Sequence, residues 1–130
     1  KSSILVVCIG STIGKVGMTA VDEACTNQQI NSIVCGEKFI PEFVFYLMEW
    51  NSKQIRGKGK NGPMPIITKG AFGQIKIFVT MDRSKQENIV SKLSPIDAAL
   101  EIGGKKQELL NKLLSSSLHQ LMTGEVRIGN

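Results

Sequence analysis

The chain has 130 residues, of which 42% are hydrophobic and 21% are charged, and its formal net charge is +5. This length suits one domain, or one domain with an appendage, and the ordinary globular composition excludes a chain that is mainly disordered. The most apolar stretch, residues 43–50, already contains Glu49, so a membrane-spanning helix of about 20 apolar residues is also excluded.

The cysteines, at positions 8, 25 and 35, are odd in number and form no Cys-x-x-Cys pair. This pattern indicates reduced thiols and a cytoplasmic protein, and it fits neither a disulfide framework nor a zinc site. The apolar run at residues 4–9 is shorter than the core of a signal peptide. Because the chain starts in that run without an initiating Met, we expect it to be a piece of a longer protein.

The first region, residues 1–80, shows short β-favouring runs separated by turn residues. Residues 4–9, 30–35 and 75–79 are predicted strands, and the glycines in residues 10–17 predict a turn that leads into another strand. Pro41 and Glu42 predict a helix start. These elements predict an α+β domain with a small sheet, mainly antiparallel or mixed, and short helices.

The helix expected from Pro41 carries apolar residues at helical spacing on one face. These residues are Phe43, Tyr46, Leu47 and Trp50. Asn51 and Ser52 are expected to end the helix, and the glycines and prolines of residues 57–65 predict a loop.

The second region, residues 81–130, is predicted to be a long helix with a tail. Apolar residues recur at steps of four and three along one heptad stripe, here called the seam. Its apolar members are Ile89, Leu93, Ile96, Leu100, Leu110, Leu114 and Leu121. Pro95 is expected to kink the helix, and Gly103 with Gly104 leaves open a division into two segments. Such a seam needs a partner helix, from another chain or from sequence outside this one.

The turn at residues 10–15 has the glycines and the lysine of a phosphate-binding loop but lacks its spacing. Three residues separate Gly10 from Gly14 where the motif needs four, and Val16 replaces the Ser or Thr that holds magnesium. A strand–turn–strand connection is therefore favoured over nucleotide hydrolysis. His119, the one histidine, has no carboxylate or cysteine at ligand spacing. We expect no catalytic residue, no metal and no cofactor in this chain.

Positive charge concentrates in the first region, in a segment without acids. Its candidate DNA-binding residues are Lys53, Arg56, Lys58, Lys60 and Asn61, in what is predicted to be a glycine-rich loop. A solvated charged loop is the alternative meaning of such a run. The amides of residues 26–29 allow two interpretations, turn formation and reading of base edges.

The order of the motifs resembles the specificity (S) subunit of type I restriction–modification enzymes. The resemblance rests on GSTIGKVG at residues 10–17, TNQQIN at 26–31, a Pro-Glu-Phe helix start, the segment 65–69 and LMTGEVRI at 121–128 after the heptad helix. It spans nearly the whole chain. Residues 79–83 depart from the Pro-Pro-Leu-like helix entry that the resemblance leads us to expect.

The resemblance implies a non-catalytic DNA-reading subunit, with residues 1–80 as the later part of a target recognition domain. Residues 81–130 would form a helix that pairs antiparallel with an equivalent helix and spaces two recognition domains. The implied partners are double-stranded DNA, the methyltransferase (M) and restriction (R) subunits, and a second S half or a second copy. Beside the basic segment, we expect Lys69 to contact phosphate, and Lys15, Asn27 and Gln28 are further candidates for facing DNA. Because Lys15, Asn27 and Gln28 fall on motifs that recur in members with different DNA targets, the resemblance favours a role in shaping the fold over a role in choosing bases. The alternative function is a coiled-coil dimerisation or adaptor module without direct DNA contact.

Overall fold

The computed structural model describes residues 2–21, 23–59, 62 and 64–126. The chain divides into two compact units, Lys1–Val90 and Ser91–Asn130. The first unit holds a sheet and short helices, and the second consists of most of one long helix.

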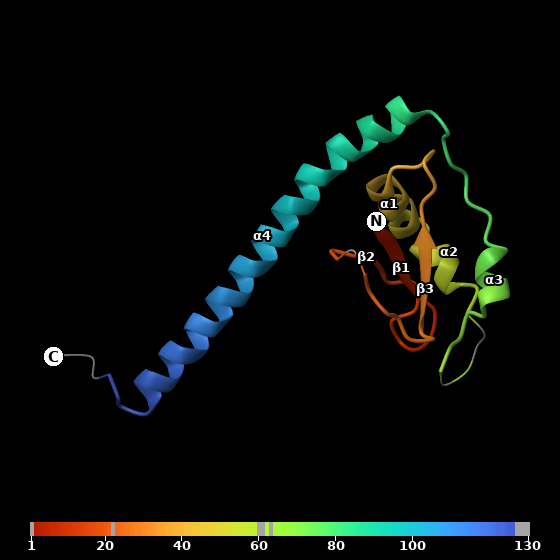
Figure 1. The fold of residues 1–130 in the computed structure, drawn as a ribbon. Helices are drawn as coiled ribbons and strands as arrows, with labels where there is room; N and C mark the ends of the chain where they lie inside the picture. The colour runs from red at the N-terminus through yellow and green to blue at the C-terminus, as the bar shows by residue number, and fades with distance from the viewer. Residues whose placement is uncertain (1, 22, 60–61, 63, 127–130) are drawn as a thin grey trace. The chain divides into compact units, whose positions relative to one another are not determined.

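Three antiparallel strands form the sheet of the first unit (Figure 1). They are β1 (Ser3–Val7), β2 (Val16–Met18) and β3 (Ile30–Val34), in the order β2-β1-β3. β1 and β2 are joined by the glycine turn, as the sequence predicts. Both pairings of β1 are antiparallel, which confirms the α+β class and decides between the antiparallel and mixed alternatives.

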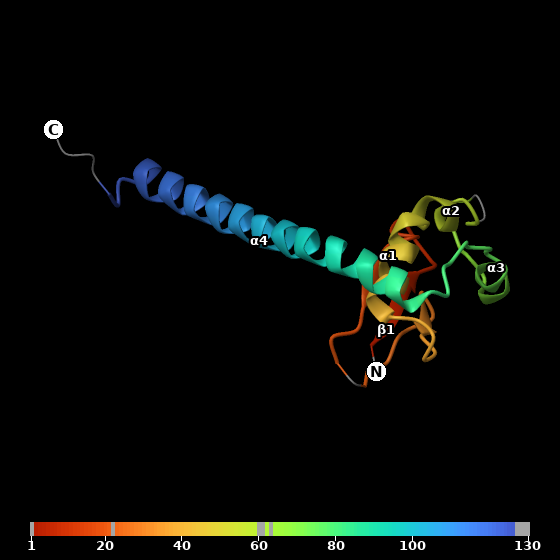
Figure 2. The same ribbon diagram turned by 90° about the horizontal axis from the view of Figure 1, so that it is seen from above.

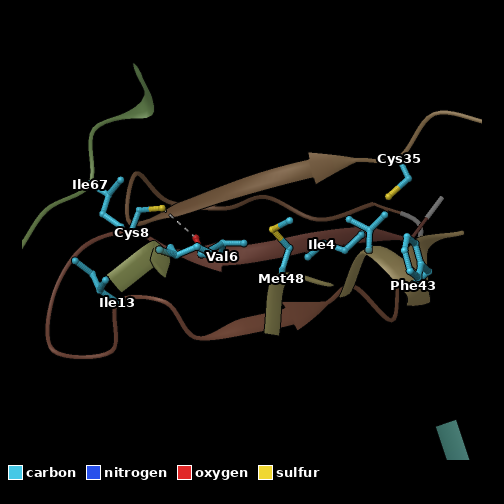
Figure 3. Close-up of a cluster of buried hydrophobic side chains, with 10 residues drawn as sticks. Ile4, Val6, Cys8, Ile13, Cys35, Phe43, Met48 and Ile67 are labelled. Carbon is cyan, nitrogen blue, oxygen red and sulfur yellow. Dashed lines mark hydrogen bonds between the residues drawn. The ribbon is translucent and has the colours of Figure 1, made fainter. Parts of the chain in front are cut away.

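One face of the sheet forms the core. Along β1, alternate side chains are buried, so Ile4, Val6 and then Cys8 point to the same side. In Figure 3, Ile4 lies beside Met48 and Phe43 of α1 (Pro41–Trp50), which covers this face, while Cys8 lies beside Ile67. Figure 2 shows α1 beside β1 from a second direction. Burial of such side chains stabilises each by about 1.5–3 kcal/mol relative to exposure.

The apolar face of α1 differs from the predicted one. Phe43, Val44 and Met48 are buried, whereas Trp50 at the end of the helix is 86% exposed. The reason lies in direction around the helix, since Met48 in the same last turn is buried and Trp50, two residues later, lies about 200° away around the helix axis. The predicted membership of Trp50 in the buried face is wrong.

Two more short helices follow α1, and one of them corrects a prediction. Lys53 and Arg56 lie in α2 (Ser52–Arg56), so the basic segment is helical up to Gly57 rather than a loop throughout. Thr68 caps α3 (Lys69–Gly73), since its hydroxyl oxygen accepts the backbone N–H of Ala71 at 3.2 Å.

The predicted strand at residues 75–79 is absent, although side-chain burial alternates from Ile75 to Phe78. Ile75 and Ile77 pack against the core and Phe78 is fully exposed, but the segment pairs with no strand. An apolar groove of about 410 Å³, lined by β3 residues and by Ile75, Ile77 and Val79, lies between the segment and β3. An extended segment can bury alternate side chains against the core without being part of a sheet, because a strand also needs a neighbouring strand at hydrogen-bonding distance.

The long helix, α4 (Arg83–Met122), has 40 residues and starts earlier than the apolar spacing indicated. Asp82 begins it by accepting the backbone N–H groups of Ser84 at 3.0 Å and Lys85 at 3.3 Å. The helix continues through Pro95, Gly103 and Gly104, so the alternative of two segments is wrong.

Candidate nucleic-acid interface

The carboxyl end of β1 joins three segments that are distant in sequence. The backbone N–H of Cys8 donates to the carbonyl of Gln29 at 2.7 Å, and the Cys8 carbonyl accepts the N–H of Ile67 at 2.8 Å. The N–H of Gly10 donates to the carbonyl of Pro65 at 3.0 Å. The turn after β1, the turn before β3 and the segment before α3 therefore meet at one end of the sheet.

The glycine turn is closed by its own backbone. Gly10 and Gly14 have φ angles of 95° and 83°, in the left-handed region that glycine adopts readily. The N–H groups of Gly10, Ile13, Gly14 and Lys15 all donate to backbone carbonyls. A phosphate-binding loop needs such groups free to point at the ligand, so this geometry supports the strand–turn–strand connection and leaves the nucleotide hypothesis without its donors.

Gly14 brings the turn against α2. A Cβ at this position would lie 2.9 Å from the backbone oxygen of Ser52, so no side chain fits there. The Arg56 side chain completes the contact because its Nε donates to the carbonyl of Ile13 at 3.2 Å. Arg56, which the sequence suggested as a DNA contact, thus has a structural bond to the turn while the residue as a whole stays exposed.

Most of the candidate basic residues surround this end of the sheet. Lys15 follows Gly14 in the turn, Lys53 and Arg56 lie on α2, Lys58 follows α2, and Lys69 opens α3. All five residues are exposed. Lys60 and Asn61 lie outside the described residues. The structure also adds Lys76, which sequence reasoning left out.

Lys76 belongs to the extended segment after α3. Its carbonyl accepts the Nε2 of Gln54 on α2 at 3.2 Å, which places this exposed lysine beside the basic helix. The charge of Lys76 made it a possible DNA contact. Because it lies in a predicted strand, the sequence did not group it with the basic segment. At the opposite end of the sheet lie carboxylates, with Glu37 after β3 and Glu42 in the first turn of α1.

Asn27 and Gln28 lie in the turn before β3, and their side chains differ in role. The Oδ1 of Asn27 accepts the N–H of Gln29 at 3.0 Å, an Asx turn that prepares Gln29 for its bond with Cys8. Gln28 is exposed. Asn27 therefore shapes the turn, while the Gln28 amide faces solvent at the end of the sheet where the lysines gather.

The thiols have different environments. Burial raises the pKa of the Cys8 thiol, against the smaller effect of Asn31, whose Nδ2 lies 3.1 Å from the sulfur. Cys35 is also buried, whereas Cys25 is exposed. Among the described residues, no three His, Cys, Asp or Glu side chains gather closely enough to hold a metal ion.

The seam residues on α4 are all exposed, by 37% for Leu93 up to 70% for Leu100. Leu109, Leu113 and Leu118 widen the apolar stripe in the carboxyl-terminal half. The charged side chains of α4 pair along the helix, as Lys105 does with Glu101 at 2.6 Å. In the described part of the chain, no helix combines the length and the apolar character needed to cross a membrane.

Comparisons with known proteins converge on one family. Residues 1–112 match the family model described as "Type I restriction modification DNA specificity domain". A curated relative, the putative type I restriction enzyme MjaX specificity subunit of Methanocaldococcus jannaschii, is 30% identical over 92 residues, which is 71% of this chain and 21% of that protein. The chain thus spans about a fifth of the length of that relative.

A solved structure shares the fold. The crystal structure of the type I restriction–modification system S subunit from M. genitalium matches with a TM-score of 0.75 at 20% identity. The match covers 91% of this chain and 32% of that one.

Proposed function

Because the chain belongs to the type I restriction modification DNA specificity family, we propose that it is a non-catalytic DNA-reading part of a type I restriction–modification complex. Residues 1–80 form the later part of a target recognition domain, and residues 81–130 form the helical spacer and its tail. Methylation and cleavage belong to partner M and R subunits, in the cytoplasm.

The observation that carries this proposal is the gathering of basic side chains at the end of β1. Lys15, Lys53, Lys58, Lys69 and Lys76 belong to segments that the backbone bonds and the Gly14–α2 contact hold around that end. Lysines at several points of one surface suit the phosphates of a duplex, each contact releasing counterions. Gln28, in the turn between them, is the candidate for reading a base edge.

The exposed seam on α4 supports the second part of the proposal. A stripe of leucine and isoleucine at heptad spacing is stable when it packs into another helix. We propose that this partner is the equivalent helix of a second S half or of a second copy, paired antiparallel. The alternative function, an adaptor that pairs through α4 without touching DNA, uses the same seam but gives the basic surface no role.

Selection from a random duplex pool tests the proposal. The chain is mixed with a type I methyltransferase subunit, and the bound duplexes are sequenced after several rounds. We expect enrichment of a short fixed half-site. Gln28→Ala should alter the enriched sequence, while Gln74→Ala, the same change at an exposed position in another segment, should leave it unchanged. No enrichment by a folded complex would favour the adaptor.

A further inference from the structure

Gln86 is the one polar residue among the buried side chains of the described part of the chain. It lies in the first turns of α4 and its relative exposure is 0%. A buried amide is tolerated only when its hydrogen bonds are made. Sequence reasoning gave this glutamine no role, because a single Gln in a helix is ordinarily a surface residue.

The Gln86 side chain bonds to two segments that precede α4. Its Oε1 accepts the backbone N–H of Ile40 at 3.0 Å, and its Nε2 donates to the carbonyls of Lys38 at 3.3 Å and Thr80 at 3.0 Å. Both amide protons are thus used. The Ile40 N–H is also the backbone group that precedes α1, so one side chain connects the starts of two helices.

Neighbouring residues on the same face of α4 add to this joint. The Nη1 of Arg83 donates to the carbonyl of Glu37 at 3.1 Å, and Val90 packs against the core. Arg83, Gln86 and Val90 follow helical spacing, so they define the side of the helix that lies against the first unit. All of these contacts lie inside that unit.

Gln86 also lies on the seam. The seam alternates steps of four and three residues, and a step of three before Ile89 places Gln86 in the same stripe as Ile89 and Leu93. The stripe is therefore polar and internally bonded at Gln86 and becomes apolar and exposed from Ile89. In coiled coils, one polar residue at a core position specifies register at some cost in stability.

We propose that Gln86 is a positioning residue that fixes the rotation of α4 about its own axis where the helix begins. It thereby determines which side of the first turns of α4, up to Val90, lies against the core of the first unit. The consequence for spacing two recognition domains rests on the proposed function, but the joint itself does not, and it is measurable on the free chain.

The test compares Gln86→Met with Gln120→Met. Met matches Gln in length but makes none of the three bonds, and Gln120 is an exposed glutamine on the same helix outside the seam. Spin labels are placed on the exposed Cys25 and on Ser84→Cys in the first turn of α4, both in the first unit, with labelled chains diluted in unlabelled ones so that only distances within a chain are read. Amide hydrogen exchange is measured on the same proteins.

We expect Gln86→Met to broaden the distribution of label distances at least about twofold and to speed exchange at the Ile40 amide at least about tenfold. Exchange at the Val7 and Cys8 amides should change by less than about threefold, and Gln120→Met should match the wild-type chain. An unchanged distance distribution would overturn the proposal. So would equal acceleration at Val7 and Cys8, or failure of the variant to fold, since Gln86 would then support the whole core. Loss of DNA selection alone would affect the proposed function and not this inference.

Discussion

At the scale of single residues, the glycine turn shows how backbone geometry shapes the candidate surface. Gly10 and Gly14 both have positive φ angles, but only Gly14 is approached closely by another segment. Gly17, in β2, has neither constraint. Substitutions of these three glycines therefore distinguish the cost of a positive φ angle from the cost of a close contact with another segment.

Alanine at these positions should destabilise the first unit in a fixed order. Gly14→Ala adds a clash with the Ser52 oxygen to the strain of a positive φ, so we expect a loss of about 3 kcal/mol or more. Gly10→Ala adds strain alone and should cost about 1–2 kcal/mol. Gly17→Ala is the matched control and should change the free energy of unfolding by less than about 1 kcal/mol. Urea unfolding measures all three, and an equal effect at Gly10 and Gly14 would contradict the packing against α2.

The Cys8 thiol gives a prediction about pH. Its folded pKa is raised by burial, so the unfolded chain releases this proton at lower pH than the folded chain does. The contribution of the neutral Cys8 thiol to the free energy of unfolding is fully present below the thiol pKa of the unfolded chain. This contribution falls as the pH rises above that pKa. Cys8→Ala should cost about 1 kcal/mol at pH 7, and the gap to the wild-type chain should narrow toward pH 9.5.

Urea midpoints of both proteins across that range measure the gap. A gap that widens with pH would show that the sign is wrong. Rates of thiol modification supply an independent check, with Cys25 reacting in the folded chain and Cys8 only after unfolding.

At the scale of elements, the sequence predicted most of the strands and helices for physical reasons that the structure bears out. β1, the glycine turn, β3 and the start of α1 follow from local residue preferences. The error at residues 75–79 arose because pairing depends on a neighbouring strand. The start of α4 was recoverable, since Asp82 is a strong helix-capping residue, but the apolar spacing does not reach it.

The seam of α4 yields a prediction about association. We expect the chain to form a species above its 14.2 kDa monomer mass as concentration rises. Leu110→Glu with Leu114→Glu puts two charges into the seam and should restore the monomer mass at concentrations at least about tenfold higher. Sedimentation equilibrium measures the mass.

Asn111→Glu with Ser115→Glu introduces the same charge at neighbouring exposed positions outside the seam. This control should associate like the wild-type chain. If both pairs of substitutions weaken association alike, charge repulsion rather than the seam explains the effect, and the pairing proposal fails.

At the scale of the whole molecule, the proposed DNA-facing end and the proposed helical spacer belong to different parts of the chain. The position of the basic surface was only partly predictable. Lys53 and Lys58 follow from the charge run. Their place beside Lys15 depends on the contact of Gly14 with Ser52 and on the bond from Arg56 to Ile13, and the place of Lys69 depends on backbone bonds between segments about 55 residues apart. Local patterns contain no information on such contacts, and the same limit hid the role of Gln86.

The central claim, that the end of the sheet around β1 contacts a duplex, is tested most directly by the salt dependence of DNA affinity. The chain in complex with a type I methyltransferase subunit is titrated with its selected duplex at several salt concentrations. Lys53→Ala with Lys58→Ala is compared with Lys38→Ala and Lys85→Ala, an equal loss of charge at exposed positions of the first unit that lie beside the Gln86 joint. We expect the first pair to lower the slope of log affinity against log salt by about two and the control pair to leave it unchanged. Equal slopes for the wild-type complex and both pairs would contradict the account.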